Sequence, residues 1–296
     1  MATKTLDRPK QDTYESEDIG NIVAMEHVNV RIPDQQIGTL FYFVGMGFTR
    51  DPHMMVGLEN MWVNVGEEQF HVPTRGQDVL RGHIGIVTPS IVTLKQRLDA
   101  VAPKLAGTKF GYEDKPGYLK VTCPWGNELR CYEPSNRWGG IVTGIPYVEF
   151  TVPVGTADGI ARFYQQAIGA PTRVSKAGGG KAAIVGVGRR QEIIYRETEG
   201  AIPDYDGHHI AIYVNNFSSV YKWLSDHGLV TETPANHQLR FKDIIDPRTG
   251  QFLFTIEHEV RSMKHLLFQR PLVNRTPGQF LEPRQVNGRT TLGMSM

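Results

Sequence analysis

The stretch Glu26-His27-Val28-Asn29-Val30 decides the fold, because three similar stretches follow it at spacings of roughly 55–65 residues. They are Gly82-His83-Ile84-Gly85-Ile86, Pro146-Tyr147-Val148-Glu149-Phe150 and His208-His209-Ile210-Ala211-Ile212. Each places a histidine or tyrosine at the start of an alternating apolar strand. A period of this length exceeds that of most solenoid repeats, so we interpret it as duplication of a larger module.

Every module repeats the same order of elements: an opening strand, a helix and then hairpin strands. Helices are expected near 34–45, 90–103, 157–168 and 217–227, where apolar residues recur at helical spacing. Paired alternating segments predict hairpins at 61–65 with 69–72, 118–122 with 128–132, 182–187 with 191–195, and 241–245 with 251–257. We therefore expect an N-terminal domain of two modules in residues 22–135 and a C-terminal domain of two modules in residues 145–260.

Composition bounds the class of protein. The chain has 296 residues, enough for two domains with full cores, and its formal net charge is only +1. This balance predicts no broad basic face for nucleic acid or for an anionic membrane. No apolar run is long enough to span a bilayer, and residues 1–21 lack the apolar segment of a signal peptide, so we expect a flexible leader and a cytoplasmic protein. Cys123 and Cys131 are expected to be free thiols.

Residues 261–296 are rich in Arg, Pro, Asn and Gly and predict an extended tail. Within it, Arg270-Pro271-Leu272-Val273-Asn274-Arg275 could wrap around a neighbouring copy and make the protein a homo-oligomer. A tail that docks on its own chain is the alternative.

The repeated order of elements resembles the vicinal oxygen chelate superfamily, which includes glyoxalase I, extradiol dioxygenases and bleomycin-resistance proteins. The resemblance rests on helices that run from a Phe-Tyr pair to a glycine, and on turns before the final strands. These motifs are Phe41-Tyr42 to Gly47, Phe163-Tyr164 to Gly169, Gly66-Glu67-Glu68, Pro124-Trp125-Gly126-Asn127 and Asp246-Pro247-Arg248-Thr249-Gly250. The resemblance covers about residues 23–259. It implies an α+β fold of four βαβββ modules, with consecutive modules paired into two cupped-sheet, open barrel-like domains.

In that superfamily, metal ligands come from the first and last strands of each module. Matched position by position, the N-terminal half offers His27 and His71 in its first module, then His83 and Arg130 in its second. The resemblance thus implies His27, His71 and His83 as ligands of a divalent metal. Arg130 would clamp an anionic substrate through its planar fork, and Tyr132 would donate or accept a proton. The sequence shows no dinucleotide-binding fingerprint.

Three neutral imidazoles suit Fe(II), Zn(II) or Mn(II) and leave positions open for a substrate. We expect a metal-dependent enzyme that acts on a small oxygenated substrate, aromatic substrates included. Fe(II) and dioxygenase chemistry are favoured, because the four-module length resembles that of ring-cleaving dioxygenases. A glyoxalase-like lyase or isomerase is the alternative reaction. The alternative to a metal-dependent enzyme is a non-catalytic protein that binds a small molecule in its cupped sheet, in which case the histidines are structural.

The C-terminal half departs from the pattern. Its corresponding positions are Tyr147, Ile193, His209 and Phe254, and only His209 is a good ligand. We expect no metal there, although a shift in register would place Glu257 beside His209 as the remnant of a second site. His208 is expected on the opposite face and exposed. The aromatic residues Phe41, Tyr42, Trp62, Phe70 and Trp125 are expected to pack cores.

Overall fold

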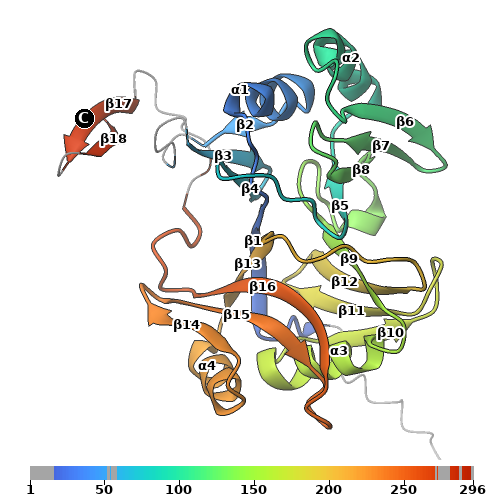
Figure 1. The fold of residues 1–296 in the computed structure, drawn as a ribbon, viewed down its shortest axis with the longest axis vertical. Coiled ribbons are helices and arrows are strands. Elements are labelled where there is room, and N and C mark those ends of the chain that lie inside the picture. Colours follow the sequence, from blue (N-terminus) through green and yellow to red (C-terminus); the bar gives the residue numbers. More distant parts are fainter. Residues whose placement is uncertain are drawn as a thin grey trace, which may run out of the picture.

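The computed structural model describes residues 17–51, 54, 59–270, 272, 281–286 and 289–294, and Figure 1 shows their arrangement. Two eight-stranded mixed sheets form the body, and helices pack against them. The α+β fold of four βαβββ modules, paired into two sheets that are not closed barrels, is therefore confirmed. No helix of the described residues is long and apolar enough to cross a membrane.

The first sheet combines modules one and four in the order β14-β15-β16-β13-β1-β4-β3-β2. The bounds are β1 Ile22–Asn29, β2 Thr49–Arg50, β3 Asn60–Val65, β4 Glu68–Pro73, β13 His209–Val214, β14 Val230–Ala235, β15 Gln238–Ile245 and β16 Phe252–Ser262. At its centre β1 and β13 run antiparallel, while β4 and β16 run parallel to them on either side.

The second sheet combines modules two and three in the order β10-β11-β12-β9-β5-β8-β7-β6. The bounds are β5 Gly82–Val87, β6 Gly111–Lys115, β7 Tyr118–Thr122, β8 Glu128–Tyr132, β9 Tyr147–Pro153, β10 Thr172–Ser175, β11 Ala182–Val187 and β12 Gln191–Thr198. Near the C-terminus β17 (Leu281–Val286) and β18 (Arg289–Met294) form a separate hairpin.

The helices follow the predicted positions closely. They are α1 Gln35–Gly38 with the π-helical η2 Thr39–Gly45, α2 Ile91–Val101 with the 3-10 turn η3 Ala102–Lys104, the 3-10 turn η4 Asn136–Trp138, α3 Ala157–Phe163 with the π-helical η5 Tyr164–Ile168, and α4 Phe217–Asp226. Asp34 caps α1, because its carboxylate accepts the amide protons of Gln36 at 2.7 Å and Ile37 at 3.0 Å. Tyr42 and Tyr164, from the two Phe-Tyr pairs, are fully buried in the π-helical ends.

The pairing of modules differs from the expectation. We expected consecutive modules to share a sheet, but each sheet takes one module from residues 22–135 and one from residues 145–260. The cause is non-local: β1 pairs with β13, and β5 pairs with β9. This correction matters for function, because it decides which histidines face one another.

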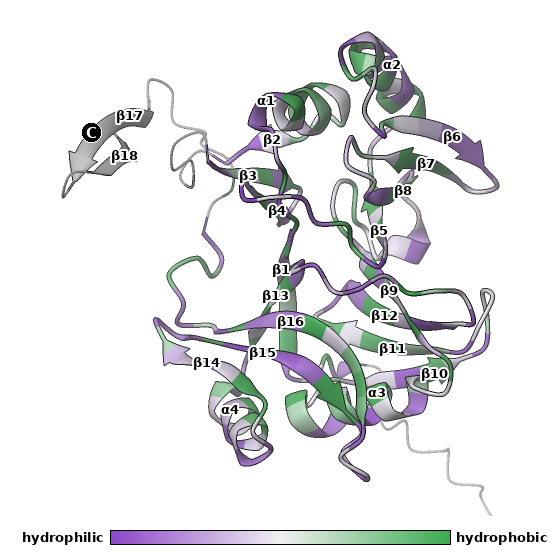
Figure 2. Cartoon of the chain, in the orientation of Figure 1, coloured by the Kyte–Doolittle hydropathy of each residue, from purple (hydrophilic) through white to green (hydrophobic). Residues whose placement is uncertain are grey.

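The second strand of each module was not located by the hairpin pattern. These strands are β2, β6, β10 and β14, and they contain no buried residue; β2, β6 and β14 are exposed along most of their length. Figure 2 shows β6 mostly in the hydrophilic colour. An outer strand that is open to water needs no alternating apolar face, so its sequence carries little signal.

Other residues outside the site correct or extend the expectations. His208 is fully buried, not exposed, because its ring packs on Phe150 of the second sheet at 6.2 Å and bonds to Asp206 at 2.6 Å. Cys123 and Cys131 are buried free thiols. Of the expected leader, residues 1–16 lie outside the described part, and the Asn21 amide donates to the Ile168 carbonyl oxygen at 2.7 Å.

Candidate metal centre

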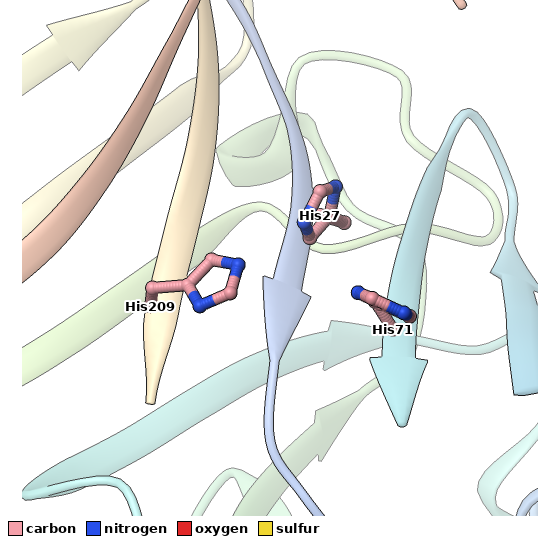
Figure 3. Close-up of side chains that lie close together, drawn as sticks. All are labelled: His27, His71 and His209. Atoms are coloured by element: carbon pink, nitrogen blue, oxygen red, sulfur yellow. The ribbon is translucent and has the colours of Figure 1, made fainter. Parts of the chain in front are cut away.

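Three histidines from neighbouring strands of the first sheet lie together on one of its faces. His27 comes from β1, His71 from β4 and His209 from β13, and Figure 3 shows their rings turned toward one another. Each offers one ring nitrogen, and these three atoms all lie within 4.8 Å of one another. We call this side of the sheet the histidine face. A metal ion needs donor atoms converging in this way, so the geometry is that of a candidate metal centre.

A bulge in β1 orients the central histidine. The register between β1 and β13 shifts between Met25 and His27, so Glu26 has no partner across the ladder. The Glu26 carboxylate bonds to His27 Nδ1 at 3.0 Å. Because a carboxylate can only accept, the ring donates its Nδ1 proton and keeps the lone pair on Nε2. A carboxylate behind a histidine is the usual support of a metal-ligating imidazole.

Glu26 is itself held in place from module four. The Tyr213 hydroxyl donates to Glu26 Oε1 at 2.6 Å, and Arg261 forms an ion pair with Oε2. Glu26, Tyr213 and Arg261 are all largely buried. The carboxylate that orients His27 is therefore fixed by the second module of the same sheet.

Two of the three imidazoles carry a buried nitrogen without a partner. His27 Nε2 and His209 Nε2 have no hydrogen-bond partner within the described part of the chain. An unsatisfied buried polar atom costs about 1–3 kcal/mol, so it calls for an explanation. A metal ion that accepts both lone pairs would explain the two unsatisfied nitrogens.

His71 is held more tightly. Its Nδ1 contacts the Asn29 amide nitrogen at 2.6 Å, its Nε2 bonds to the Asn60 side-chain oxygen, and its ring stacks on Trp62 at 4.1 Å. The Asn29 amide donates to the Nδ1 lone pair, so His71 exchanges that contact when it ligates a metal. Trp62 is buried, as expected of a core residue, and its ring also lines the site.

Burial sets the protonation of the cluster. Loss of water around the rings lowers the pKa of His27, His71 and His209 well below the ordinary imidazole value. All three are neutral at pH 7 and present lone pairs without first losing a proton. This donor set fits Fe(II), Zn(II) or Mn(II).

Glu259 occupies the fourth corresponding position. On β4, His71 lies opposite Asn29, and on β16 Glu259 lies opposite Ala211, which is the same place relative to His209. Its carboxylate is 3.7 Å from His209 Nε2, and it forms ion pairs with Arg240 and Arg261. Burial raises the pKa of Glu259.

Sequence reasoning missed Glu259 and placed Phe254 there, with Glu257 as the alternative. The two last strands differ in length, because β16 has 11 residues and β4 has 6, so similar sequence patterns do not mark the same position in both. Glu257 does approach His209, at 3.6 Å from Nδ1, although Arg240 pairs with it. Glu259 could be found only from the register between β13 and β16, and that register is known only once the pairing of the strands is known.

The other predicted site residues lie in the second sheet. His83 Nε2 bonds to the Tyr147 hydroxyl at 3.2 Å, and the Tyr132 and Tyr147 hydroxyls are 2.8 Å apart. Arg130 pairs with Glu128 at 2.8 Å. The structure does not bring these residues to His27 and His71, and the reason is the pairing of β5 with β9. The catalytic roles of Arg130 and Tyr132 stay predictions.

Comparisons with known proteins bear on the fold. No protein-family model matches the chain, and no curated protein matches it in sequence. The structure of glyoxalase I from Zea mays superposes with a TM-score of 0.56 at 16% identity, covering 81% of this chain and 92% of that one. A protein of Bacillus subtilis subsp. subtilis str. 168, described as a candidate dioxygenase, gives a TM-score of 0.55 at 17% identity, covering 82% and 86%. The fold implied by the vicinal oxygen chelate resemblance is therefore confirmed.

Proposed function

We propose that this protein is a metal-dependent enzyme whose metal is held by His27, His71 and His209. The observation that carries the proposal is the convergence of one ring nitrogen each from His27, His71 and His209 within 4.8 Å, where Nε2 of His27 and His209 has no partner among the described residues. A buried imidazole that only fills space normally satisfies both ring nitrogens. Structural histidines in a non-catalytic cup therefore explain the cluster less well.

A bound divalent ion would polarise the oxygens of a chelated substrate, or activate dioxygen if the ion is iron. The chain itself supplies orientation: Glu26 holds the His27 ring, while Arg240 and Arg261 hold Glu259. Trp62 covers the ring of His71 on one side. These contacts exclude water and keep the ligands in one geometry.

Oxygenase chemistry with Fe(II) is the reaction we propose. It needs histidine and carboxylate ligands on one side of the ion and open positions on the other. His27, His71 and His209 would supply the histidines, and Glu259, at 3.7 Å from His209 Nε2, is the carboxylate beside them. The substrate class is a small molecule with two adjacent oxygens, including aromatic diols.

One observation favours a second reaction, a glyoxalase-like lyase or isomerase. Glu259 is buried with a raised pKa next to His209. A carboxylate of this kind is suited to move a proton to and from a carbon next to a carbonyl group. In that case the ion would be Zn(II) or Mn(II), and no oxygen would be consumed.

The test is metal content by mass spectrometry on tag-free protein, before and after anaerobic reconstitution. His27→Ala and His209→Ala should abolish stoichiometric metal, while His83→Ala should retain it and serves as the matched control. Loss of metal in His83→Ala with retention in His209→Ala would overturn the site. Oxygen uptake with a panel of catechols then separates oxygenase from lyase, and failure to take up any metal would favour a binding protein.

A further inference from the structure

The chain after β16 crosses the histidine face. Residues 263–270 leave module four and run to the side of module one, which Figure 1 shows as the orange-red segment that rises from β16 toward β3. Phe268 packs edge-on against Tyr213 of β13 at 4.9 Å, and His265 lies 6.3 Å from the same ring. Tyr213 is the residue that bonds to Glu26, so the segment covers the support of His27.

Arg270 ends this crossing on module one. Its Nη2 forms an ion pair with the buried Asp51 and donates to Gln69 Oε1 at 3.2 Å. Just beyond it, the Leu272 carbonyl oxygen accepts from the Asn64 amide. Asn64 and Gln69 face each other across β3 and β4. The docking is therefore polar and specific. In the predicted oligomer segment, Pro271 and residues 273–275 lie outside the described part, so oligomerisation stays a prediction.

Strand register places Arg270 next to the candidate metal centre. Gln69 is the direct partner of His27 in the β1–β4 ladder. It also lies two residues before His71, and side chains two residues apart in a strand point to the same face. The guanidinium that contacts Gln69 therefore lies on the side of the histidine face, bonded to the residue that pairs with His27 in the ladder.

The guanidinium has donors that its protein contacts do not use. Nη2 accounts for the contacts to Asp51 and Gln69. Nε and Nη1 are fully buried and have no partner in the part of the chain that the structure describes. Neutralisation of Asp51 explains why a cation is buried here. It does not explain two idle donors, because a lysine would neutralise Asp51 without them.

We propose that Nε and Nη1 of Arg270 bind the carboxylate of a substrate whose two adjacent oxygens lie at the histidine cluster. The substrate is then a small organic acid with a chelating group at one end and a carboxylate at the other. A singly charged carboxylate suits the site better than a dianionic phosphate for two reasons. Asp51 already neutralises Arg270, and two further carboxylates, Glu257 and Glu259, lie on the same sheet. This inference rests on the proposed metal-dependent function and adds the substrate class.

The experiment compares two chelators that differ in one carboxylate. Acetohydroxamate binds a metal through two adjacent oxygens, and succinic and glutaric monohydroxamate add a carboxylate on a chain of graded length. Isothermal titration of Zn(II)-loaded protein should show that one of the carboxylated probes binds at least about tenfold more tightly than acetohydroxamate, since even one of the two charge-assisted hydrogen bonds gives that ratio. Hydrogen exchange of amides 263–270 should slow only with that probe.

Arg270→Gln should remove the preference and leave both the metal content and the affinity for acetohydroxamate unchanged. Arg173→Gln is the matched control, because Arg173 is 60% exposed and pairs with Glu192 on the surface. If Arg270→Gln misfolds because Asp51 loses its partner, Arg270→Lys retains the charge without the fork and should lose most of the preference.

The outcomes separate the two proposals. A protein that binds metal and acetohydroxamate without favouring either carboxylated probe refutes the role of Arg270 and leaves the metal site standing. A preference that survives in both Arg270 variants refutes it equally. A protein that binds neither metal nor acetohydroxamate ends the proposed function, and this inference with it.

Discussion

Glu68 links the pH dependence of stability to the joint between the two sheets. It begins β4 of the first sheet and is only 5% exposed. Its Oε2 accepts the amide proton of Ile145 at 2.9 Å, next to Gly144, which bridges to Val87 of the second sheet. Burial raises the pKa of Glu68 from its ordinary 4.5 to about 7. The folded protein therefore holds a proton that the unfolded chain has already lost.

The sign and size of the effect follow from proton linkage. Between pH 4.5 and about 7 the folded state binds more protons than the unfolded state, so the free energy of unfolding falls as pH rises. The contribution of Glu68 is fully present below pH 4.5 and is lost above about pH 7. At 1.36 kcal/mol per pKa unit, the total is about 3 kcal/mol. Glu68→Gln retains an acceptor for Ile145 and cannot ionise.

The assay is urea unfolding of wild type and Glu68→Gln from pH 4.5 to 8 with a chelator present, followed by circular dichroism. As pH rises, the free energy of unfolding of the variant should increase relative to that of the wild type, by about 3 kcal/mol over the range. The buried histidines, whose lowered pKa values make the protein lose stability on acidification, are common to both proteins and cancel. A difference in free energy of unfolding that stays constant with pH would refute the reasoning.

Three further predictions concern the site and the second sheet. Glu26→Gln should weaken metal binding about 10–100-fold, because the His27 ring loses its charged acceptor, and competition with a coloured chelator measures this. Metal content should be the same at about pH 7.5 and pH 6, because burial keeps His27, His71 and His209 neutral where an exposed histidine becomes protonated; equilibrium dialysis that shows release by pH 6 would contradict it. Gly85→Ala should destabilise by about 1–3 kcal/mol in thermal unfolding, because its Cβ would collide with the Tyr147 ring; an unchanged melting temperature would argue against that packing.

Local patterns predicted the local structure well. The strands expected at 118–122 and 128–132 are β7 and β8, and the helix expected near 34–45 begins just after the Asp34 cap. Hydrophobic alternation and capping depend on neighbours in sequence, which is why a single chain reveals them. The predicted ligands His27 and His71 also lie together, because they belong to the same module.

The remaining part of the site depends on contacts between distant segments. His83 and His209 occupy similar places in their modules, and only the pairing of β1 with β13 decides that His209 joins His27. The bulge that orients Glu26 is visible only in the register of that pair. Arg270 reaches the histidine face from a segment without periodicity. Sequence pattern alone does not encode these choices, since each is set by tertiary packing.

Module one pairs with module four, and module two pairs with module three. This pairing also sets the order in which the two sheets can form while the chain is synthesised on the ribosome. The inner edge of β1 finds its partner only when β13 has emerged, after the whole second sheet has been made. Until then the nascent first module presents an unpaired edge, which is a template for aggregation. Modules two and three, adjacent in the chain, can close their own sheet first. The candidate metal centre is thus among the last features to assemble, and a ribosome stalled before residue 209 holds a chain that cannot form it.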